Sequence, residues 1–405
     1  MEMKNRILFV DDEQHLLDGL KRSLRSQRNV WEMSFADSGE EAVRLTEELH
    51  FDVVVTDMRM PGMNGAELLE RLSENYPDMI RLILSGHSDD ALILKAVPYA
   101  HQFLAKPCDA EVIKQVITRS LKLKSLVEDG RMQTLVSQIR SLPTLPELYV
   151  ELTDLLNSDR VSVQKVGEVI GKDPAMVSKI LQMVNSAFFG IGHHISSPVQ
   201  AATMLGTETL RGLVLSAGIF IQYDTKALNI GDFTLAALHR HSLQVSRLAK
   251  AIAESMGAEK RVVEDSLLAG LLHDIGKLIL VQSLPNEYRK FFKKIHDCQA
   301  ELLEAERSVF HVDHGRVGAY LLGLWALPDS LVEAVAYHHE PQLSGHFGFS
   351  PLLAVHVADA LTSAHSTDAA VIPAGLDMTY LEASGVADRL DEWRALHGSL
   401  LKEAG

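Results

Sequence analysis

The first part of the chain contains short apolar runs that lack helical spacing. Residues 7–10 and 53–55 are aliphatic, aromatic or β-branched throughout, and 82–84 and 103–105 form two further runs of the same kind. Uninterrupted apolar runs of this length are typical of parallel strands that are buried on both faces. The pattern predicts an N-terminal α/β domain with a doubly wound parallel sheet.

From Pro146 onward the apolar positions recur at helical spacing, and strand-like alternation is absent. Helix breaks are expected where proline or glycine interrupts this pattern, because proline removes a backbone donor and disfavours a helical residue before it. The predicted breaks are Asp173-Pro174, Ser197-Pro198, Gly206, Pro285, Pro328 and Pro341. We expect an all-α helical bundle, closed by an amphipathic helix over 388–401.

Apolar residues between the two halves predict one continuous helix from Asp109 to about Arg140. The prolines of the segment 141–146 end it. Two interpretations stay open for this region. It is either the last helix of the first domain followed by a linker, or a signalling helix that pairs in a dimer.

Length, charge and cysteine content narrow the class of protein. A chain of 405 residues exceeds what one core usually holds, so two or three domains are expected. The net charge of −15 argues against nonspecific binding to nucleic acid or to an anionic membrane. The apolar stretch 210–221 is too short to span a bilayer, and the start has no signal-peptide pattern. Two cysteines are too few for a disulfide framework, so we expect a cytoplasmic protein.

Polar residues follow the predicted strands at the points where the strands end. Asp11-Asp12 and Asp57 come directly after two apolar runs, while Ser85 and Lys106 follow the other two. Because ligands of doubly wound sheets bind outside the carboxyl ends of the strands, these side chains are expected to meet. Such oxygen ligands suit Mg²⁺, and a carboxylate in this setting can accept a phosphoryl group. The alternative is that each aspartate only caps the helix that follows it.

The stretches ILFVDDE, VVVTDMRMPGMNG, LILSGHSD and QFLAKP resemble the receiver domain of response regulators, over about 6–121. The resemblance implies a flavodoxin-like five-stranded sheet, with Asp57 as the phosphoacceptor. It also implies a sensor histidine kinase as the partner that supplies the phosphoryl group. The residues implied for Mg²⁺ are Asp12 and Asp57 directly, Asp11 through water, and the carbonyl of Arg59. The residues implied for the phosphoryl response are Ser85, Lys106 and, at the aromatic switch position, Phe103.

The second half contains a series of histidines and aspartates. A charged pair inside the apolar stretch LLAGLLHDIGK is costly unless it is hydrogen-bonded or bound to metal. A single histidine there would most often be a satisfied core residue, but six more candidate ligands favour a metal site. Imidazole with carboxylate and without thiolate suits one or two ions of Fe, Mn, Ni or Zn. The candidate ligands are His241, His273, Asp274, His314, His338, His339 and Asp359.

These residues are similar in order to the HD superfamily of metal-dependent phosphohydrolases. More narrowly, DPAMVSKILQMVNSAFFG, LLHDIGK, DHGRVGAYLLGLWALP and YHHEP resemble the HDOD output domain, over about 142–361. This resemblance adds Lys277 as a candidate catalytic residue. HDOD domains generally serve as signalling outputs. The related HD-GYP phosphodiesterases cleave cyclic di-GMP, but their Gly-Tyr-Pro motif is missing from HHEPQLSGHFGFSP, so this resemblance argues against that activity.

Together these patterns predict a receiver domain at 1–122, a linker or signalling helix at 123–141, an HDOD domain at 142–362 and a helical extension at 363–405. We expect a phosphorylation-controlled response regulator that transmits its signal to a downstream protein by contact. A homodimer is a further expected partner, and nucleic acid and membrane are not. The competing hypothesis is a metal-dependent phosphodiesterase that is gated by the receiver.

Overall fold

The computed structural model describes the chain outside a set of short segments. Those segments are 1–3, 87–91, 93–94, 140–141, 145, 159–160, 186–194, 212–213, 215–220, 223–229, 231–232, 299–300, 365–371 and 405. Part of the LILSGHSD and DPAMVSKILQMVNSAFFG motifs and most of the apolar stretch 210–221 therefore lie outside the described residues.

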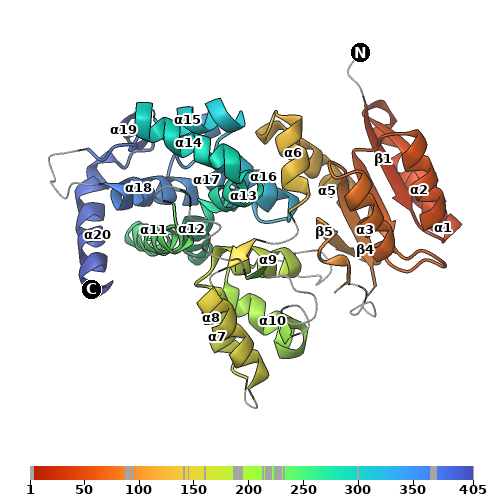
Figure 1. Ribbon diagram of the computed structural model, residues 1–405, viewed down its shortest axis with the longest axis horizontal. Helices are drawn as coiled ribbons and strands as arrows, with labels where there is room; N and C mark the ends of the chain where they lie inside the picture. Colours follow the sequence, from red (N-terminus) through yellow and green to blue (C-terminus); the bar gives the residue numbers. More distant parts are fainter. Residues whose placement is uncertain are drawn as a thin grey trace.

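A five-stranded parallel sheet with the order β2-β1-β3-β4-β5 forms the N-terminal half, drawn in red and orange in Figure 1. Its β3 and β4 strands are buried along their whole length, as the apolar runs predict. In the register Asp57 lies opposite Leu84, and Ser85 opposite Ala105, so the ends of three strands share one edge. The α/β prediction is confirmed. The strands are β1 (Asn5–Val10), β2 (Trp31–Ala36), β3 (Val53–Asp57), β4 (Ile80–Ser85) and β5 (Gln102–Ala105).

Local capping explains where the helices of this half begin. Ser38 accepts a hydrogen bond from the backbone of Glu41, and Asn64 forms a capping box with Glu67. These caps satisfy backbone donors that have no partner within the helix. The helices are α1 (Gln14–Ser23), η1 (Leu24–Asn29), α2 (Gly39–Glu48), α3 (Gly65–Asn75) and α5 (Ala110–Leu123).

The second half is built almost entirely of helices, which confirms the all-α prediction. The predicted breaks are also confirmed: helices begin at Pro174, Pro198 and Pro285, and Gly206 kinks α10 with a φ of 75°. Trp393 on the last helix is buried and donates to Ser255 on α11, so this helix closes the bundle as expected. The helices are α7 (Pro146–Asn157), α8 (Val163–Ile170), α9 (Pro174–Val184), α10 (Pro198–Arg211), α11 (Leu235–Ser255), α12 (Lys260–Leu272), α13 (Ile275–Ser283), α14 (Pro285–Cys298), α15 (Leu302–Phe310), α16 (His314–Leu324), α17 (Asp329–Tyr337), η5 (Pro341–Ser344), α18 (Pro351–Ser363), α19 (Met378–Ala383), η6 (Ala387–Arg389) and α20 (Leu390–Ala404).

One expectation about the middle of the chain is wrong, and one small element was not predicted. The continuous helix over 109–140 is broken, because α5 ends in the short turn η2 (Lys124–Leu126) and Val127 is extended. Asp129 then caps a separate helix, α6 (Gly130–Ser137). The helical half also contains a small parallel pair, β6 (Pro143–Thr144) with β7 (Ile221–Gln222). Two-residue strands are too short to show any alternation in the sequence.

The sheet domain contacts helix α6 of the linker through buried polar groups. Arg81 on β4 is 3% exposed and donates to the carbonyls of Tyr99 and Ser137, each at 2.7 Å. His101 accepts from the backbone of Arg81 through Nδ1, so its neutral ring donates from Nε2 to Ser137. Burial and the neighbouring Arg81 hold the pKa of His101 well below its usual range. These contacts fix α6 against the sheet.

Helix α9 contacts the segment that leads into β5. Gln182 donates to the carbonyl of His101 at 3.1 Å, and the ammonium of Lys179 lies 3.5 Å from the carbonyl of Val97. The same ammonium lies 4.7 Å from the ring centroid of Trp325, a cation–π contact. The segment 97–101, which precedes the switch candidate Phe103, is therefore in contact with helix α9 of the helical half.

Helix α16 contacts the sheet domain with its C-terminal end. A side chain at Gly323 would collide with Leu123 of α5, so the glycine admits Leu123 to the helix surface. Arg119 donates to Asp329 at 2.9 Å and to the carbonyl of Leu327. Figure 1 shows α5, α6 and α16 adjacent at this junction.

Lys179 gives the junction a predicted pH dependence. Burial lowers its pKa to about 7 from 10.5, and no carboxylate pairs with it among the described residues. The unfolded chain therefore binds more protons between these two values, and stability rises as the pH increases from about 7 toward about 10. The variant Lys179→Met should remove this rise and stabilise the protein near pH 7 by on the order of a few kcal/mol. Urea unfolding between about pH 7 and 10 measures the free energy of unfolding of each variant. The control is Lys165→Met, which replaces an exposed lysine on α8. An equal dependence of the free energy of unfolding on pH in the two variants would contradict the prediction.

No single helix among the described residues is long and apolar enough to cross a membrane. One sharply bent pair, Lys260–Ser283 with Pro285–Ile295, meets the length and composition requirement only when its two parts are joined.

Candidate functional site

Three carboxylates gather at the shared edge of the parallel sheet. Asp11 and Asp57 are 2% and 7% exposed, whereas Asp12 is open to solvent. One oxygen atom of each of the three lies within 4.8 Å of the others. Asp11 follows β1 and Asp57 ends β3, so the convergence predicted from strand ends is confirmed. Hard oxygen donors at this spacing, one of them exposed, fit Mg²⁺.

Lys106 balances the charge of this group. Its ammonium lies 2.6 Å from Oδ1 of Asp57 and 2.8 Å from Oδ2 of Asp11. Burial raises the pKa of Asp57, although the hydrogen bond from Lys106 opposes that rise. The two carboxylates raise the pKa of Lys106 in spite of its burial. Lys106 therefore stays cationic beside Asp57, where it can neutralise a phosphoryl group.

The remaining predicted residues lie on or just after the neighbouring strands β3, β4 and β5. Ser85 is fully buried at the end of β4, and its hydroxyl has no hydrogen-bond partner among the described residues. The backbone N–H of Arg59 donates to Oδ2 of Asp57 at 3.1 Å. Phe103 is 1% exposed and pairs with Ile83 in the sheet register. An unpaired buried hydroxyl is costly, so Ser85 is suited to accept a new partner.

All seven metal-ligand candidates converge inside the helical half. They come from five places in the bundle: α11 carries His241, the α12–α13 junction carries His273 and Asp274, and α16 begins with His314. The pair His338-His339 follows α17, and Asp359 lies on α18. Three overlapping groups of three ligands each have donor atoms within 4.8 Å. Residues 118 positions apart, such as His241 and Asp359, thus meet at 3.0 Å.

The histidines at the centre face each other with ring nitrogens. Nε2 of His273 lies 3.3 Å from Nε2 of His241, and Nε2 of His314 lies 3.3 Å from Nε2 of His338. Asp274 lies between the two pairs, with Oδ1 at 3.1 Å from His314 and Oδ2 at 3.4 Å from His273. Among the described residues, Nε2 of His339 is buried without a hydrogen bond.

The outer nitrogens of two histidines determine which of their atoms point inward. Nδ1 of His273 lies 2.8 Å from the carbonyl of Gly270, and Nδ1 of His338 lies 2.8 Å from that of Val335. A carbonyl can only accept, so both rings carry a proton on Nδ1 and present the lone pair of Nε2 when neutral. Each of these Nε2 atoms lies 3.3 Å from the Nε2 of a second histidine, His241 or His314, so a proton or a cation is shared within each pair. This arrangement fits a metal site, in which outer hydrogen bonds orient the histidine ligands.

The electrostatics of the cluster also fit metal ligands. Burial lowers the pKa of His339 to about 3 and that of His338 well below its usual range, so both rings are neutral. Burial alone would lower the pKa of His314, but Glu306 and Asp274 raise it to about 9. Burial opposes ionisation of Asp274 and Asp359, yet the surrounding histidines hold both pKa values well below their usual range. The cluster thus combines two neutral imidazoles, His338 and His339, and two ionised carboxylates with a protonated His314, whose proton a bound metal would displace.

Glu306 is a supporting residue that the sequence did not reveal. It is fully buried on α15, lies 2.8 Å from Nδ1 of His314, and accepts from the backbone of the same residue at 2.9 Å. Carboxylates in this position orient a histidine ligand and raise its basicity. The only signal was an acidic residue at a core position, between Ala305 and Phe310.

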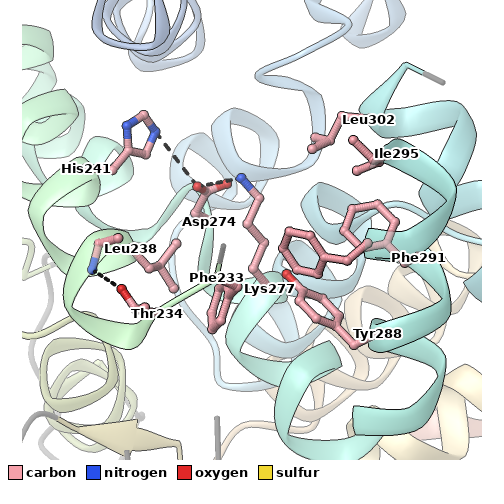
Figure 2. A pocket seen from close by; sticks show the side chains of 12 residues that line it. Phe233, Thr234, Leu238, His241, Asp274, Lys277, Tyr288, Phe291, Ile295 and Leu302 are labelled. Carbon is pink, nitrogen blue, oxygen red and sulfur yellow. Dashed lines mark hydrogen bonds and ion pairs between the residues drawn. The ribbon is translucent and has the colours of Figure 1, made fainter. Parts of the chain in front are cut away.

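The cluster opens to the surface on the side of Lys277. Its ammonium lies 2.7 Å from Oδ2 of Asp274 and borders a pocket of about 280 Å³. Figure 2 shows Lys277 extended toward Asp274, with His241 on the opposite side and aromatic rings along the pocket wall. Lys277 therefore lies where a group entering the pocket would meet the cluster.

Close packing of two glycines holds Asp274 against His314. A side chain at Gly276 would lie 1.9 Å from the carbonyl oxygen of His314 and 3.0 Å from the backbone nitrogen of Gly318. Gly276→Ala should therefore lower the free energy of unfolding by about 3 kcal/mol, since α13 must move away from α16. The control is Gly398→Ala on α20, where nothing lies within 4 Å, and which should gain up to ~1 kcal/mol. Urea denaturation measures both, and equal midpoints would contradict the packing argument.

Two protein-family models match the chain. The response regulator receiver domain matches residues 7–118, and the HDOD domain matches residues 142–341. The first match contains every predicted residue at the sheet edge. The second contains all of the metal-ligand candidates except Asp359, which lies beyond its end.

Individual proteins are similar to parts of this chain. The transcriptional regulatory protein DegU of Brevibacillus brevis is 32% identical over 29% of this chain and 50% of its own length. A cyclic di-GMP phosphodiesterase of Thermotoga maritima is 22% identical over 67% of this chain and 56% of its own length. The chain thus spans about half the length of these curated relatives. Among solved structures, the MmoQ response regulator of Methylococcus capsulatus is 22% identical, with a TM-score of 0.48 over 63% of this chain and 98% of its own.

Proposed function

This chain belongs to the response regulators, with a receiver domain followed by an HDOD output domain, and from this we propose that phosphorylation of Asp57 controls the docking of the output half. The receiver implies a kinase as the partner that supplies the phosphoryl group. We propose a sensor histidine kinase, with the downstream protein bound by contact.

The proposed phosphorylation chemistry uses the residues of the sheet edge. An oxygen of Asp57 attacks the phosphorus atom of the donor, and the bond from phosphorus to the donor breaks. Mg²⁺, which receiver domains generally bind, would be held by Asp12, Asp57 and the carbonyl of Arg59, with Asp11 acting through water. It supplies positive charge to the phosphoryl oxygens. Lys106 pairs with the same oxygens, and the hydroxyl of Ser85 gains the partner that it lacks.

The observation that carries the proposal is the contact between helix α9 and the segment before β5. Gln182 and Lys179 hold the carbonyls of His101 and Val97, two and six residues before Phe103. A phosphoryl group that draws Ser85 and Phe103 toward Asp57 would alter this segment and weaken its hold on α9. Such a shift needs a contact that differs between the two states, and we propose that the contact of α9 with this segment is the one that differs.

The histidine cluster is proposed to hold one or two transition-metal ions, of Fe, Mn, Ni or Zn. The ligands would be His241, His273, Asp274, His314, His338, His339 and Asp359. A metal in such a site can lower the pKa of bound water and generate a hydroxide nucleophile. The full ligand set therefore favours a second candidate function, a phosphodiesterase gated by the receiver, with Lys277 in contact with the substrate.

We expect the metal-loaded, phosphorylated protein to show no detectable hydrolysis of cyclic di-GMP. Gly-Tyr-Pro is missing after His338-His339, where the chain instead forms the turn η5 and exposes Leu343 and Phe347. Chromatography of the nucleotide products, with Asp274→Ala as the matched control, measures this. If wild type hydrolyses the nucleotide and Asp274→Ala does not, the phosphodiesterase is the correct function and signalling by protein contact is not.

A further inference from the structure

An aromatic pocket adjoins the metal-ligand cluster at the start of α11 and along α14. It has a volume of about 280 Å³, and Figure 2 shows its rings grouped opposite His241. Four aromatic residues line it: Phe233, Tyr288, Phe291 and Phe292. Asp274 and Lys277 line the same pocket on the side of the cluster. A concave apolar site with a few convergent polar groups is typical of small-molecule binding.

The aromatic wall is packed as a rigid unit. Tyr288 is 1% exposed, and its ring meets Phe233 edge-on at 5.5 Å and Phe292 edge-on at 5.4 Å. Phe291 is 2% exposed and meets Phe292 edge-on at 5.3 Å. Rings held in this way can stack on or edge against a planar ligand at little cost in side-chain entropy. The wall is therefore suited to a flat apolar group.

The opposite end of the pocket suits an anion. Lys277 is the single cationic side chain among the described residues that line it, and its ammonium neutralises Asp274 at 2.7 Å. With two divalent ions on the adjacent ligands, the positive charge at this end, including that of Lys277, would exceed the three negative charges of Asp274, Glu306 and Asp359. An oxyanion on the ligand would complete the balance.

The size of the pocket favours a ligand that places one ring inside it. A cavity of about 150 Å³ is enough for benzene, so about 280 Å³ holds one ring with an anionic substituent. A cyclic dinucleotide, with two bases and two phosphates, is too large to be enclosed. We infer that this pocket binds a small aromatic oxyanion, a single-ring phosphate or carboxylate, with its ring against Phe233 and Phe292 and its oxyanion toward Lys277. This inference rests on the proposed metal site.

Helix α11 offers a matched pair of variants for the test. Ala237 is exposed and lines the pocket, whereas its neighbour Ala236 is equally exposed and does not line it. Ala237→Phe places a ring into the pocket, and Ala236→Phe adds the same ring on the same helix outside it. Neither residue belongs to the core or to the ligand set, so both variants are expected to keep the fold and the metal.

The experiment is titration calorimetry on the full-length, metal-loaded protein, with metal content measured in the same samples. The probes are phenyl phosphate and phenylacetate, with methyl phosphate as the probe without a ring. We expect binding of at least one aromatic probe, about tenfold or more weaker binding of methyl phosphate, and a similar loss in Ala237→Phe but not in Ala236→Phe. The tighter of the two aromatic probes identifies the ligand as a phosphate or a carboxylate.

The outcomes separate this inference from the metal proposal. Metal-loaded protein that binds neither aromatic probe, or binds methyl phosphate equally well, would overturn the pocket assignment and leave the metal site standing. Equal binding by the two phenylalanine variants would overturn it in the same way. If the purified wild-type protein contains no metal, both the metal proposal and this inference are wrong.

Discussion

Replacing Asp274 with asparagine is expected to empty the histidine cluster of metal. Asp274 is the central carboxylate, with its two oxygens at 3.1 Å from His314 and 3.4 Å from His273. Asparagine keeps the shape but removes the charge, and it places an amide nitrogen where an oxygen donor is needed. Loss of an outer-shell partner already costs about 10- to 100-fold in metal affinity, so loss of this inner ligand should cost more than about 100-fold.

Elemental analysis of the purified full-length protein measures this directly. The matched control is Asp265→Asn, because Asp265 is also buried on α12 and accepts from Ser330 at 2.9 Å, yet it lies outside the cluster. Wild type and Asp265→Asn should contain metal, and Asp274→Asn should not. If wild type contains none, the cluster is a hydrogen-bonded core, and Asp274→Asn should then differ from wild type in stability alone.

The sheet edge could be predicted from sequence because its geometry follows from local rules. Apolar runs set the strands, parallel strands place their carboxyl ends together, and each functional side chain follows a strand directly. Asp57 and Lys106 therefore meet at 2.6 Å as expected, although they are far apart in the sequence. The helix breaks at Pro174, Pro198 and Pro285 were predictable for a similar reason, since proline acts on its own residue and the one before it.

The parts that escaped prediction depend on contacts between distant elements. Val127 leaves the helix because Asp129 caps a new one and Val127 itself is fully buried, which hydrophobic spacing alone does not reveal. Glu306 resembles any acidic residue of an amphipathic helix until α15 is placed beside His314. The aromatic pocket likewise requires α11 and α14 to be adjacent. Periodicity specifies elements, whereas their partners are set by tertiary packing.

Asp57→Asn is expected to abolish uptake of a phosphoryl group from a small-molecule phosphodonor. Asp57 presents a carboxylate oxygen beside Lys106, and asparagine has no nucleophilic oxygen of that kind. Intact-mass spectrometry in the presence of Mg²⁺ should show one added phosphoryl group on wild type and none on the variant. Asp78→Asn, which changes a half-exposed aspartate away from the sheet edge, is the control and should label like wild type. Equal labelling of Asp57→Asn would refute the assignment, and removal of Mg²⁺ should stop labelling altogether.

The central claim is that the phosphoryl group on Asp57 loosens the junction between the two halves. Backbone amide hydrogen exchange of the full-length protein, with and without phosphodonor, tests it most directly. We expect phosphorylation to speed exchange in α9 and in the segment 97–101, where Gln182 holds the carbonyl of His101, and to leave Asp57→Asn unchanged under the same treatment. Exchange in α9 and 97–101 that is the same in phosphorylated and unphosphorylated wild type would contradict the account.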